Sequence, residues 1–168
     1  MSFNLARNRP LVLDTDVAVL FYVGATDPQL IGKHQRTSDF DHHDFRLLWE
    51  IVSEASKLVV SPYVAAEVSN LALDKPNIGQ SARNRISEVL REHLETAAEA
   101  YVECAAAVKD ENFDALGVTD SALLLILRDN PHLHLLTDDF TLSQIGQSRK
   151  LKVHNFSHIR DRREDFRA

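Results

Sequence analysis

The sequence contains few of the residues that would point to a secreted or membrane protein. It has one cysteine, Cys104, which cannot form a disulfide within the chain, so a disulfide-stabilised scaffold is excluded. Its longest aliphatic run, residues 122–127, is far shorter than the roughly 20 residues of a membrane-spanning helix. Asp14 and Asp16 interrupt the first apolar stretch, which therefore does not resemble a secretion signal. We expect a cytoplasmic protein with no membrane partner.

Glycine is scarce too, and five glycines in 168 residues fit a helix-rich domain with few tight turns. With 44% hydrophobic and 26% charged residues, the composition is that of a globular domain and excludes a disordered chain. The formal net charge of −6 is uneven, because residues 149–168 carry seven basic and three acidic side chains and the rest carries −10. An acidic body argues against broad phosphate binding, although a metal site would itself concentrate carboxylates. We expect a domain over residues 1–156 and a basic tail (residues 157–168) that contacts phosphates or is a solvated terminal segment.

Short apolar runs alternate with helical patterns along the chain. One amphipathic stripe contains Trp49, which we expect in the core. Segment 101–108 fits either a strand or a helix. The alternation predicts an α/β fold with a central, mostly parallel sheet. The predicted strands are 10–13, 58–60, 133–136 and 151–154, and the predicted helices are 17–22, 41–56, 62–73, 80–98, 119–128 and 141–147.

Acidic side chains follow two of the predicted strands directly. Asp14 and Asp16 come after the first strand, and Asp138 and Asp139 come after residues 133–136. In a parallel sheet all strands end at one edge, here called the carboxyl edge, where ligands bind at the point of strand-order reversal. Taken singly, each pair also fits a helix start or a turn. Together they place carboxylates at one edge of the sheet.

Two further acids belong to helices that we expect beside this edge. Glu67 lies next to the apolar stripe of helix 62–73, and Asp120 opens a helix that is apolar nearly all round. Singly, Glu67 fits an ion pair with an arginine and Asp120 fits a helix-dipole charge. Packed together, such carboxylates repel by about 4 kcal/mol per pair at 4 Å, unless some are protonated or a cation compensates. All-oxygen ligands favour Mg²⁺ or Mn²⁺.

Four motifs carry these acids in a fixed order over residues 9–156. They are Leu11-Val-Leu-Asp14-Thr15-Asp16, Ser61-Pro-Tyr-Val-Ala-Ala-Glu67-Val68, Leu116-Gly-Val-Thr-Asp120-Ser-Ala122 and Thr137-Asp138-Asp139-Phe140. In order and spacing the chain resembles a PIN domain, the metal-dependent nuclease fold found in VapC-type toxin ribonucleases. One departure is Asp16, where that family more often has Asn or Ser.

The resemblance implies a three-layer α/β/α sandwich and an endoribonuclease that hydrolyses RNA phosphodiester bonds with one or two Mg²⁺ or Mn²⁺ ions. The implied principal ligands are Asp14, Asp120 and Asp139, with Glu67 completing the set directly or through water and Asp16 as an added ligand. Thr137 would position a water or a ligand. Thr15 and Asn70 are weaker candidates for substrate contact. A toxin would also bring an antitoxin protein as partner, and the family often forms homodimers. No separate role is assigned to Asp138.

Two other classes of function stay open at this point. Asp14 and Asp16 also resemble the opening motif of haloacid-dehalogenase-type phosphatases, with Asp14 as nucleophile and Asp16 as general acid. However, Ala18 replaces the expected Thr or Val, and Glu67 and Asp120 would have no role. The second alternative is a non-catalytic PIN-like binding module that uses the acids as a docking pocket.

Overall fold

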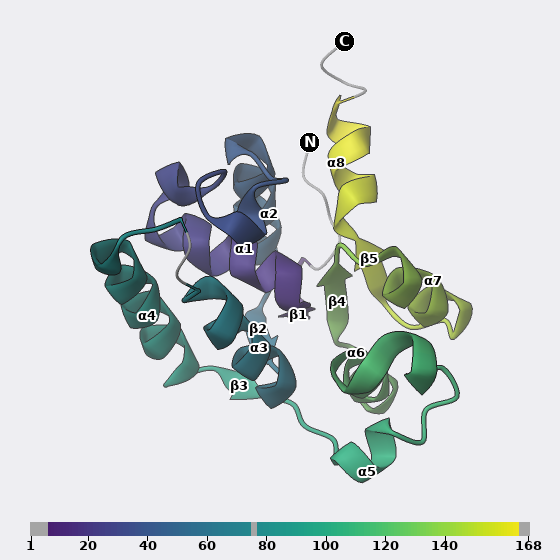
Figure 1. Cartoon of the computed structure of the whole chain (residues 1–168). Helices are drawn as coiled ribbons and strands as arrows, with labels where there is room; N and C mark the ends of the chain where they lie inside the picture. Colours follow the sequence, from purple (N-terminus) through teal and green to yellow (C-terminus); the bar gives the residue numbers. More distant parts are fainter. Residues whose placement is uncertain (1–6, 75–76, 165–168) are drawn as a thin grey trace.

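The computed structural model describes residues 7–74 and 77–164, which form an α/β fold around a five-stranded sheet (Figure 1). All strand pairs in this sheet are parallel, as predicted. The strand order is β3-β2-β1-β4-β5. The strands are β1 (Pro10–Leu13), β2 (Lys57–Val60), β3 (Ala98–Glu99), β4 (His134–Thr137) and β5 (Val153–Asn155).

Eight α-helices flank the sheet in the described residues. Helices α1, α3 and α4 pack against one another on one side, and α6 and α7 lie on the other side (Figure 1). None of the helices in the described residues has the length and apolar character needed to cross a membrane. The helices are α1 (Thr15–Thr26), α2 (His42–Glu54), α3 (Pro62–Ala72), α4 (Gln80–Leu94), α5 (Cys104–Ala107), α6 (Phe113–Asp129), α7 (Phe140–Ser148) and α8 (Phe156–Glu164).

The strand order reverses between β1 and β4, and this reversal places the candidate site. Strands β2 and β3 extend the sheet on one side of β1, whereas β4 and β5 extend it on the other. Leu13 pairs with Leu136, and the Asp14 amide donates to the Leu136 carbonyl at 3.0 Å. The chain therefore leaves β1 and β4 side by side and in opposite directions, and this point at the carboxyl edge is where ligands bind in open parallel sheets.

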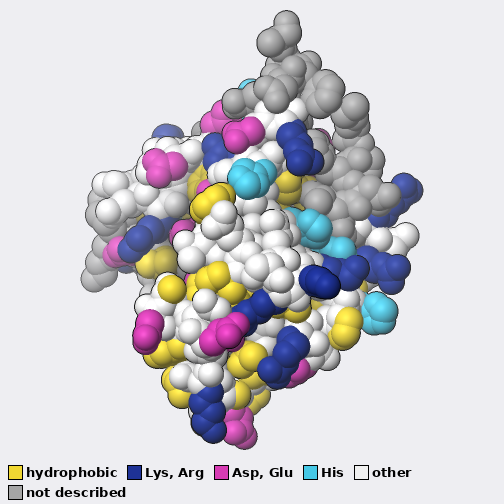
Figure 2. Space-filling view, turned by 90° about the vertical axis from the view of Figure 1, so that its right-hand side faces the viewer, with side chains coloured by type: hydrophobic (Ala, Val, Ile, Leu, Met, Phe, Trp, Pro, Cys, Tyr) yellow, Lys and Arg dark blue, Asp and Glu magenta, His cyan; other side chains and the backbone are white. Residues whose placement is uncertain are grey.

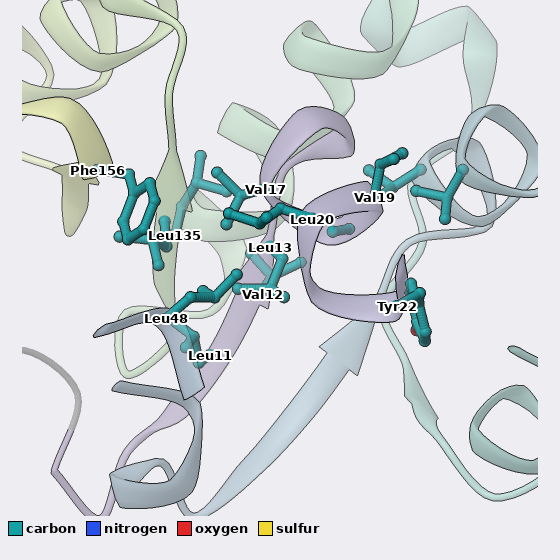
Figure 3. Packing of buried hydrophobic residues seen from close by; sticks show 14 of the residues in the cluster. Leu11, Val12, Leu13, Val17, Val19, Leu20, Tyr22, Leu48, Leu135 and Phe156 are labelled. Carbon is teal, nitrogen blue, oxygen red and sulfur yellow. The ribbon is translucent and has the colours of Figure 1, made fainter. Parts of the chain in front are cut away.

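The central strand β1 and helix α1 form the middle of the hydrophobic core (Figure 3). Leu11 and Val12 in β1, and Val17 and Leu20 in α1, are at most 1% exposed. Figure 3 shows them close to Leu135 in the neighbouring strand. Burying such side chains contributes roughly 1.5–3 kcal/mol each. The carboxyl edge is thus supported by a rigid centre of the molecule.

Several sequence predictions of secondary structure were wrong in extent. Helix α1 starts at Thr15 rather than at residue 17, since Asp14 caps it. Helix α4 ends at Leu94 and is followed by β3, where a helix to residue 98 was expected. Segment 101–108 contains only the short helix α5. Trp49 is 49% exposed instead of buried, because α2 buries the neighbouring Leu47, Leu48 and Ile51 and Trp49 stacks on Phe21 at the surface.

The described part of the basic tail belongs to α8, while residues 165–168 lie outside the described residues. Within α8, Ile159 is buried. The Arg160 guanidinium pairs with Asp44 at 2.9 Å and lies over the Phe40 ring. The first part of α8 therefore packs against the rest of the domain, whereas Asp161 and Arg162 are exposed.

Three other basic residues of the C-terminal stretch do not lie at the carboxyl edge. Arg149, Lys150 and Lys152 precede β5, so they lie at the opposite end of the sheet. Figure 2 shows Lys and Arg side chains gathered on the side of the molecule that carries α7 and β5. Arg149 is also paired with Asp110, at 2.7 Å. These residues are poorly placed to contact a phosphate bound at the carboxyl edge.

Candidate functional site

Asp14 lies at the centre of the carboxyl edge, directly after β1. It is the N-cap of α1, and its Oδ1 accepts a hydrogen bond from the Asp16 amide at 3.1 Å. Its Oδ2 accepts a hydrogen bond from the Thr137 hydroxyl on β4. The side chain is only 7% exposed. Asp14 is thus held by groups from both strands at the point of strand-order reversal.

Thr137 connects Asp14 to the acidic residues that follow β4. Besides donating to Asp14, its hydroxyl accepts a hydrogen bond from the Asp139 amide at 2.9 Å. Asp139 is the N-cap of α7 and accepts from the Leu142 amide at 2.7 Å. Thr137 is fully buried, whereas Asp139 is exposed. The predicted positioning role of Thr137 is therefore consistent with its contacts to both acids.

Glu67 joins the edge from the middle of α3. Its Oε2 accepts a hydrogen bond from the Thr15 hydroxyl at 2.8 Å, and its Oε1 accepts from the Thr119 hydroxyl. Glu67 is exposed, although the sequence placed it at the margin of the buried face. The two threonines belong to α1 and α6, so Glu67 links three helices at one place.

Asp120 follows Thr119 in α6, next to a break in that helix. Gly117 has φ 72° and ψ −172° inside the helix, which divides α6 into two parts. Thr119 and Asp120 consequently occupy the first turn of the second part, where the helix dipole favours negative charge. Asp120 is partly buried, while the residues after it from Ser121 to Leu127 are buried. The helix break at Gly117 therefore determines where Asp120 is positioned in the site.

Gly117→Ala is expected to lower the melting temperature by about 2–8 °C, because this backbone region is essentially limited to glycine and costs about 1–3 kcal/mol otherwise. A Cβ at Gly117 would meet nothing within 4 Å, so a clash would not contribute. Calorimetry measures the change. The matched control is Gly79→Ala, at φ −69° and likewise with open space, where a smaller loss is expected. Equal losses in both variants would show that the Gly117 backbone conformation is not the cause.

Burial and mutual repulsion raise the pKa of two of the acids. The pKa of Asp14 rises to about 7, first because the carboxyl is buried and then because Asp16 and Asp139 are close, against the opposing hydrogen bond from Thr137. The pKa of Asp120 also rises to about 7, again through burial first and then through Asp14, Asp139 and Glu67. The four acids (Asp14, Glu67, Asp120, Asp139) therefore share one electrostatic environment. Neighbouring carboxyls with strongly perturbed pKa values are typical of functional sites.

Asp16 and Asp138 lie next to the four acids. Asp16 is exposed at the start of α1, but its carboxyl is partly shielded by the surrounding residues. This partial burial raises the pKa of Asp16, Arg36 opposes the rise, and Asp138, Asp139 and Glu67 add to it. Asp138 accepts a hydrogen bond from the Ser157 hydroxyl on α8 at 2.6 Å, so it connects the edge to that helix.

Oxygen ligands of this kind suit Mg²⁺ or Mn²⁺. In the part of the chain that the structure describes, no three His, Cys, Asp or Glu side chains are close enough to hold one ion between them. Mg²⁺ needs fewer, since it usually keeps several waters and binds one or two carboxylates directly. The raised pKa values of Asp14 and Asp120 mark an excess of negative charge that a divalent cation would neutralise. The donor set fits such an ion with water completing its shell.

The remaining predicted residues differ in how closely they join the site. Thr15 is part of it through Glu67. Asn70 is exposed, and within residues 7–74 and 77–164 no hydrogen bond connects it to another candidate. Sequence reasoning missed Thr119 and Arg36. Thr119 precedes Asp120 directly and was recoverable from that position, whereas Arg36 lies in a short 3-10 helix (Gln35–Thr37) with no motif of its own.

Comparison with known proteins adds no assignment: no protein-family model matches this chain, and no curated protein matches it. The resemblance to PIN domains therefore depends on the four motifs and on the contacts described above.

Proposed function

We propose that the protein is a metal-dependent endoribonuclease of the PIN type, the toxin of a toxin–antitoxin pair. The observation that carries this proposal is the convergence of the four acids, from four separate segments, at the reversal of strand order. The raised pKa values of Asp14 and Asp120, each caused in part by the neighbouring acids, support a site that works with a cation. One or two of Asp14, Asp120 and Asp139 would bind the ion directly and the others through water, with Glu67 and Asp16 beside it.

A bound Mg²⁺ or Mn²⁺ would neutralise a phosphodiester and lower the pKa of a water molecule next to it. The chain's own residues orient the participants. Thr137 keeps the Asp14 carboxylate aimed along the edge and fixes the Asp139 backbone. Thr15 and Thr119 hold both oxygens of Glu67, which leaves that carboxylate ready to accept a hydrogen bond from water. Such fixed orientation lowers the entropic cost of reaching the transition state.

The two other classes of function account for fewer of these contacts. A phosphatase with Asp14 as nucleophile leaves Glu67 and Asp120 unused, although both affect the electrostatics of the same site. A non-catalytic module has no need for buried acids that repel one another. An antitoxin with basic side chains would fit the acidic edge, and a homodimer is a further part of the proposal.

Incubation of the purified protein with cellular RNA tests the activity directly. We expect cleavage with Mn²⁺ or Mg²⁺ and none after chelation with EDTA. The same ions should raise the melting temperature at pH 8, because a ligand that binds only the folded state stabilises it. A phosphomonoester substrate run in parallel separates a nuclease from a phosphatase. Intact RNA together with a melting temperature that does not respond to either ion would contradict the proposal.

A further inference from the structure

Exposed aromatic rings occur on both sides of the four acids. Among the large hydrophobic side chains that are exposed in the described residues, Tyr101 at 63% and Phe140 at 55% are the most exposed. Tyr101 comes two residues after the end of β3, and Phe140 comes three residues after the end of β4. Both therefore lie at the carboxyl edge, where rings of this size are costly to leave in water.

Tyr101 is half of a fixed stack. Its ring lies against the Tyr63 ring with centroids 6.2 Å apart and planes inclined by 12°. The Tyr63 hydroxyl donates to the Val102 carbonyl at 2.6 Å, which ties α3 to the segment that carries Tyr101. One face of Tyr101 is covered by Tyr63, and its high exposure leaves the other face open to solvent. The stack is thus preorganised to receive a further flat ring.

This stack is one helical turn from the acids. Tyr63 and Glu67 are four residues apart in α3, so they are neighbours on one face of the helix. Glu67 is hydrogen-bonded to Thr15 of α1 and to Thr119 of α6. The face of α3 that carries Tyr63 therefore continues to the four acids.

A second aromatic pair borders the acids on the other side. Phe140 follows Asp139 directly and packs edge-on against His158 of α8, with centroids 6.1 Å apart. In the strand order, Tyr101 and Tyr63 follow β3 and β2, Asp14 follows β1, and Phe140 follows β4. Neighbouring strands are about 4.8 Å apart. Along the carboxyl edge from β3 to β4, the stack of Tyr101 and Tyr63 therefore comes first, the four acids follow, and Phe140 comes last.

We infer that this edge binds single-stranded RNA, with unpaired bases stacked on Tyr101 and on Phe140 and the phosphate between them at the four acids. The inference rests on the proposed function and narrows its substrate to RNA with unpaired bases on both sides of the cleaved bond. Aromatic side chains bind any unpaired base through its ring face. Bases inside a duplex have both faces covered by their neighbours, so a duplex cannot use these rings.

Binding of a short fluorescein-labelled single-stranded RNA tests the inference, measured with Ca²⁺ in place of Mn²⁺ so that a metal ion is present while hydrolysis of the phosphodiester bonds is suppressed. Tyr101→Ala and Phe140→Ala are each expected to raise the Kd for the single strand about 5- to 100-fold. Tyr101→Phe should retain tight binding, since it keeps the ring. Trp49→Ala removes another exposed aromatic side chain, from α2 and away from the strand ends, and should leave the Kd unchanged. The same sequence as a duplex should bind weakly to all variants.

The outcomes separate this inference from the proposed activity. If the wild-type protein cleaves natural RNA while both alanine variants keep its KM and its Kd, the stacking inference is wrong and the activity stands. If the wild-type protein binds the single strand through Tyr101 but cleaves no RNA, the stacking inference stands and the activity is wrong. Equal or tighter binding of the duplex would overturn the inference, as would the absence of any single-strand binding.

Discussion

Asp14→Asn is expected to reduce metal-dependent RNA cleavage by about 10²- to 10³-fold or more while leaving the fold intact. The substitution removes the buried negative charge at the centre of the four acids. It keeps the helix cap, because Asn accepts the hydrogen bond from the Asp16 amide as well as Asp does. Initial cleavage rates with saturating Mn²⁺, together with circular dichroism of the variant, measure the two effects separately.

Asp41→Asn is the matched control for this variant. Asp41 also caps a helix, accepting hydrogen bonds from the His43 and Asp44 amides at 2.7 and 2.9 Å, but it lies outside the four acids. Its substitution should leave cleavage unchanged. If Asp14→Asn cleaves RNA at the wild-type rate, the assignment of Asp14 to the reaction is wrong.

Asp120→Asn should raise the melting temperature of the metal-free protein by about 3–8 °C at pH 8. The folded state holds this carboxyl in a partly buried position beside Asp14, Asp139 and Glu67, which raises its pKa from 3.8 to about 7. Removing the charge therefore relieves a penalty that exists only in the folded state. Mn²⁺ should reduce the difference in melting temperature between the variant and the wild-type protein, since the ion stabilises the wild-type protein by neutralising the Asp120 charge.

The pH dependence gives the same prediction an independent check. Because the pKa of Asp120 is higher in the folded state, the folded protein binds more protons between about pH 4 and about pH 7. The free energy of unfolding therefore falls as pH rises through this window, and Asp14 acts in the same direction. The increase in melting temperature caused by Asp120→Asn should disappear near pH 4, where the Asp120 carboxyl of the wild-type protein is protonated in the folded state.

Asp114→Asn, at an exposed acid before the break in the same helix, should have little effect at either pH. A melting temperature of Asp120→Asn several degrees below wild type at pH 8 would show that Asp120 is structural.

The strands could be predicted from the sequence because burial on both faces leaves a continuous apolar run. Residues 10–13 were predicted within one residue of the true bounds, and so was β4. Strand β3 was missed, since two residues, Ala98 and Glu99, carry no periodic signal, and their pairing with β2 is a long-range contact. The position of Asp14 and Asp139 at one edge followed from a geometric rule about parallel strands, which is why it could be anticipated without knowing the strand order.

The details around the acids depend on tertiary contacts that no local pattern encodes. Trp49 has the spacing of a core residue, but the face that α2 buries is set by how α1 packs against it. Arg36 comes close to Asp16 only through the path of the loop between α1 and α2. The sequence does not distinguish Tyr101 from any other surface tyrosine, because its stack with Tyr63 exists only in the folded chain. Such features follow from long-range packing, so a single sequence leaves them open.

The position of β1 between β2 and β4 also governs when the molecule becomes complete during translation. Strand β1 leaves the ribosome early, but β4 follows only after most of the chain has been made. Until β4 arrives, Asp14 lacks both the Leu136 carbonyl and the Thr137 hydroxyl. A chain that stops short of β4 has an open strand edge at β1 and lacks Asp139, so the four acids cannot come together until residues 134–139 have been made.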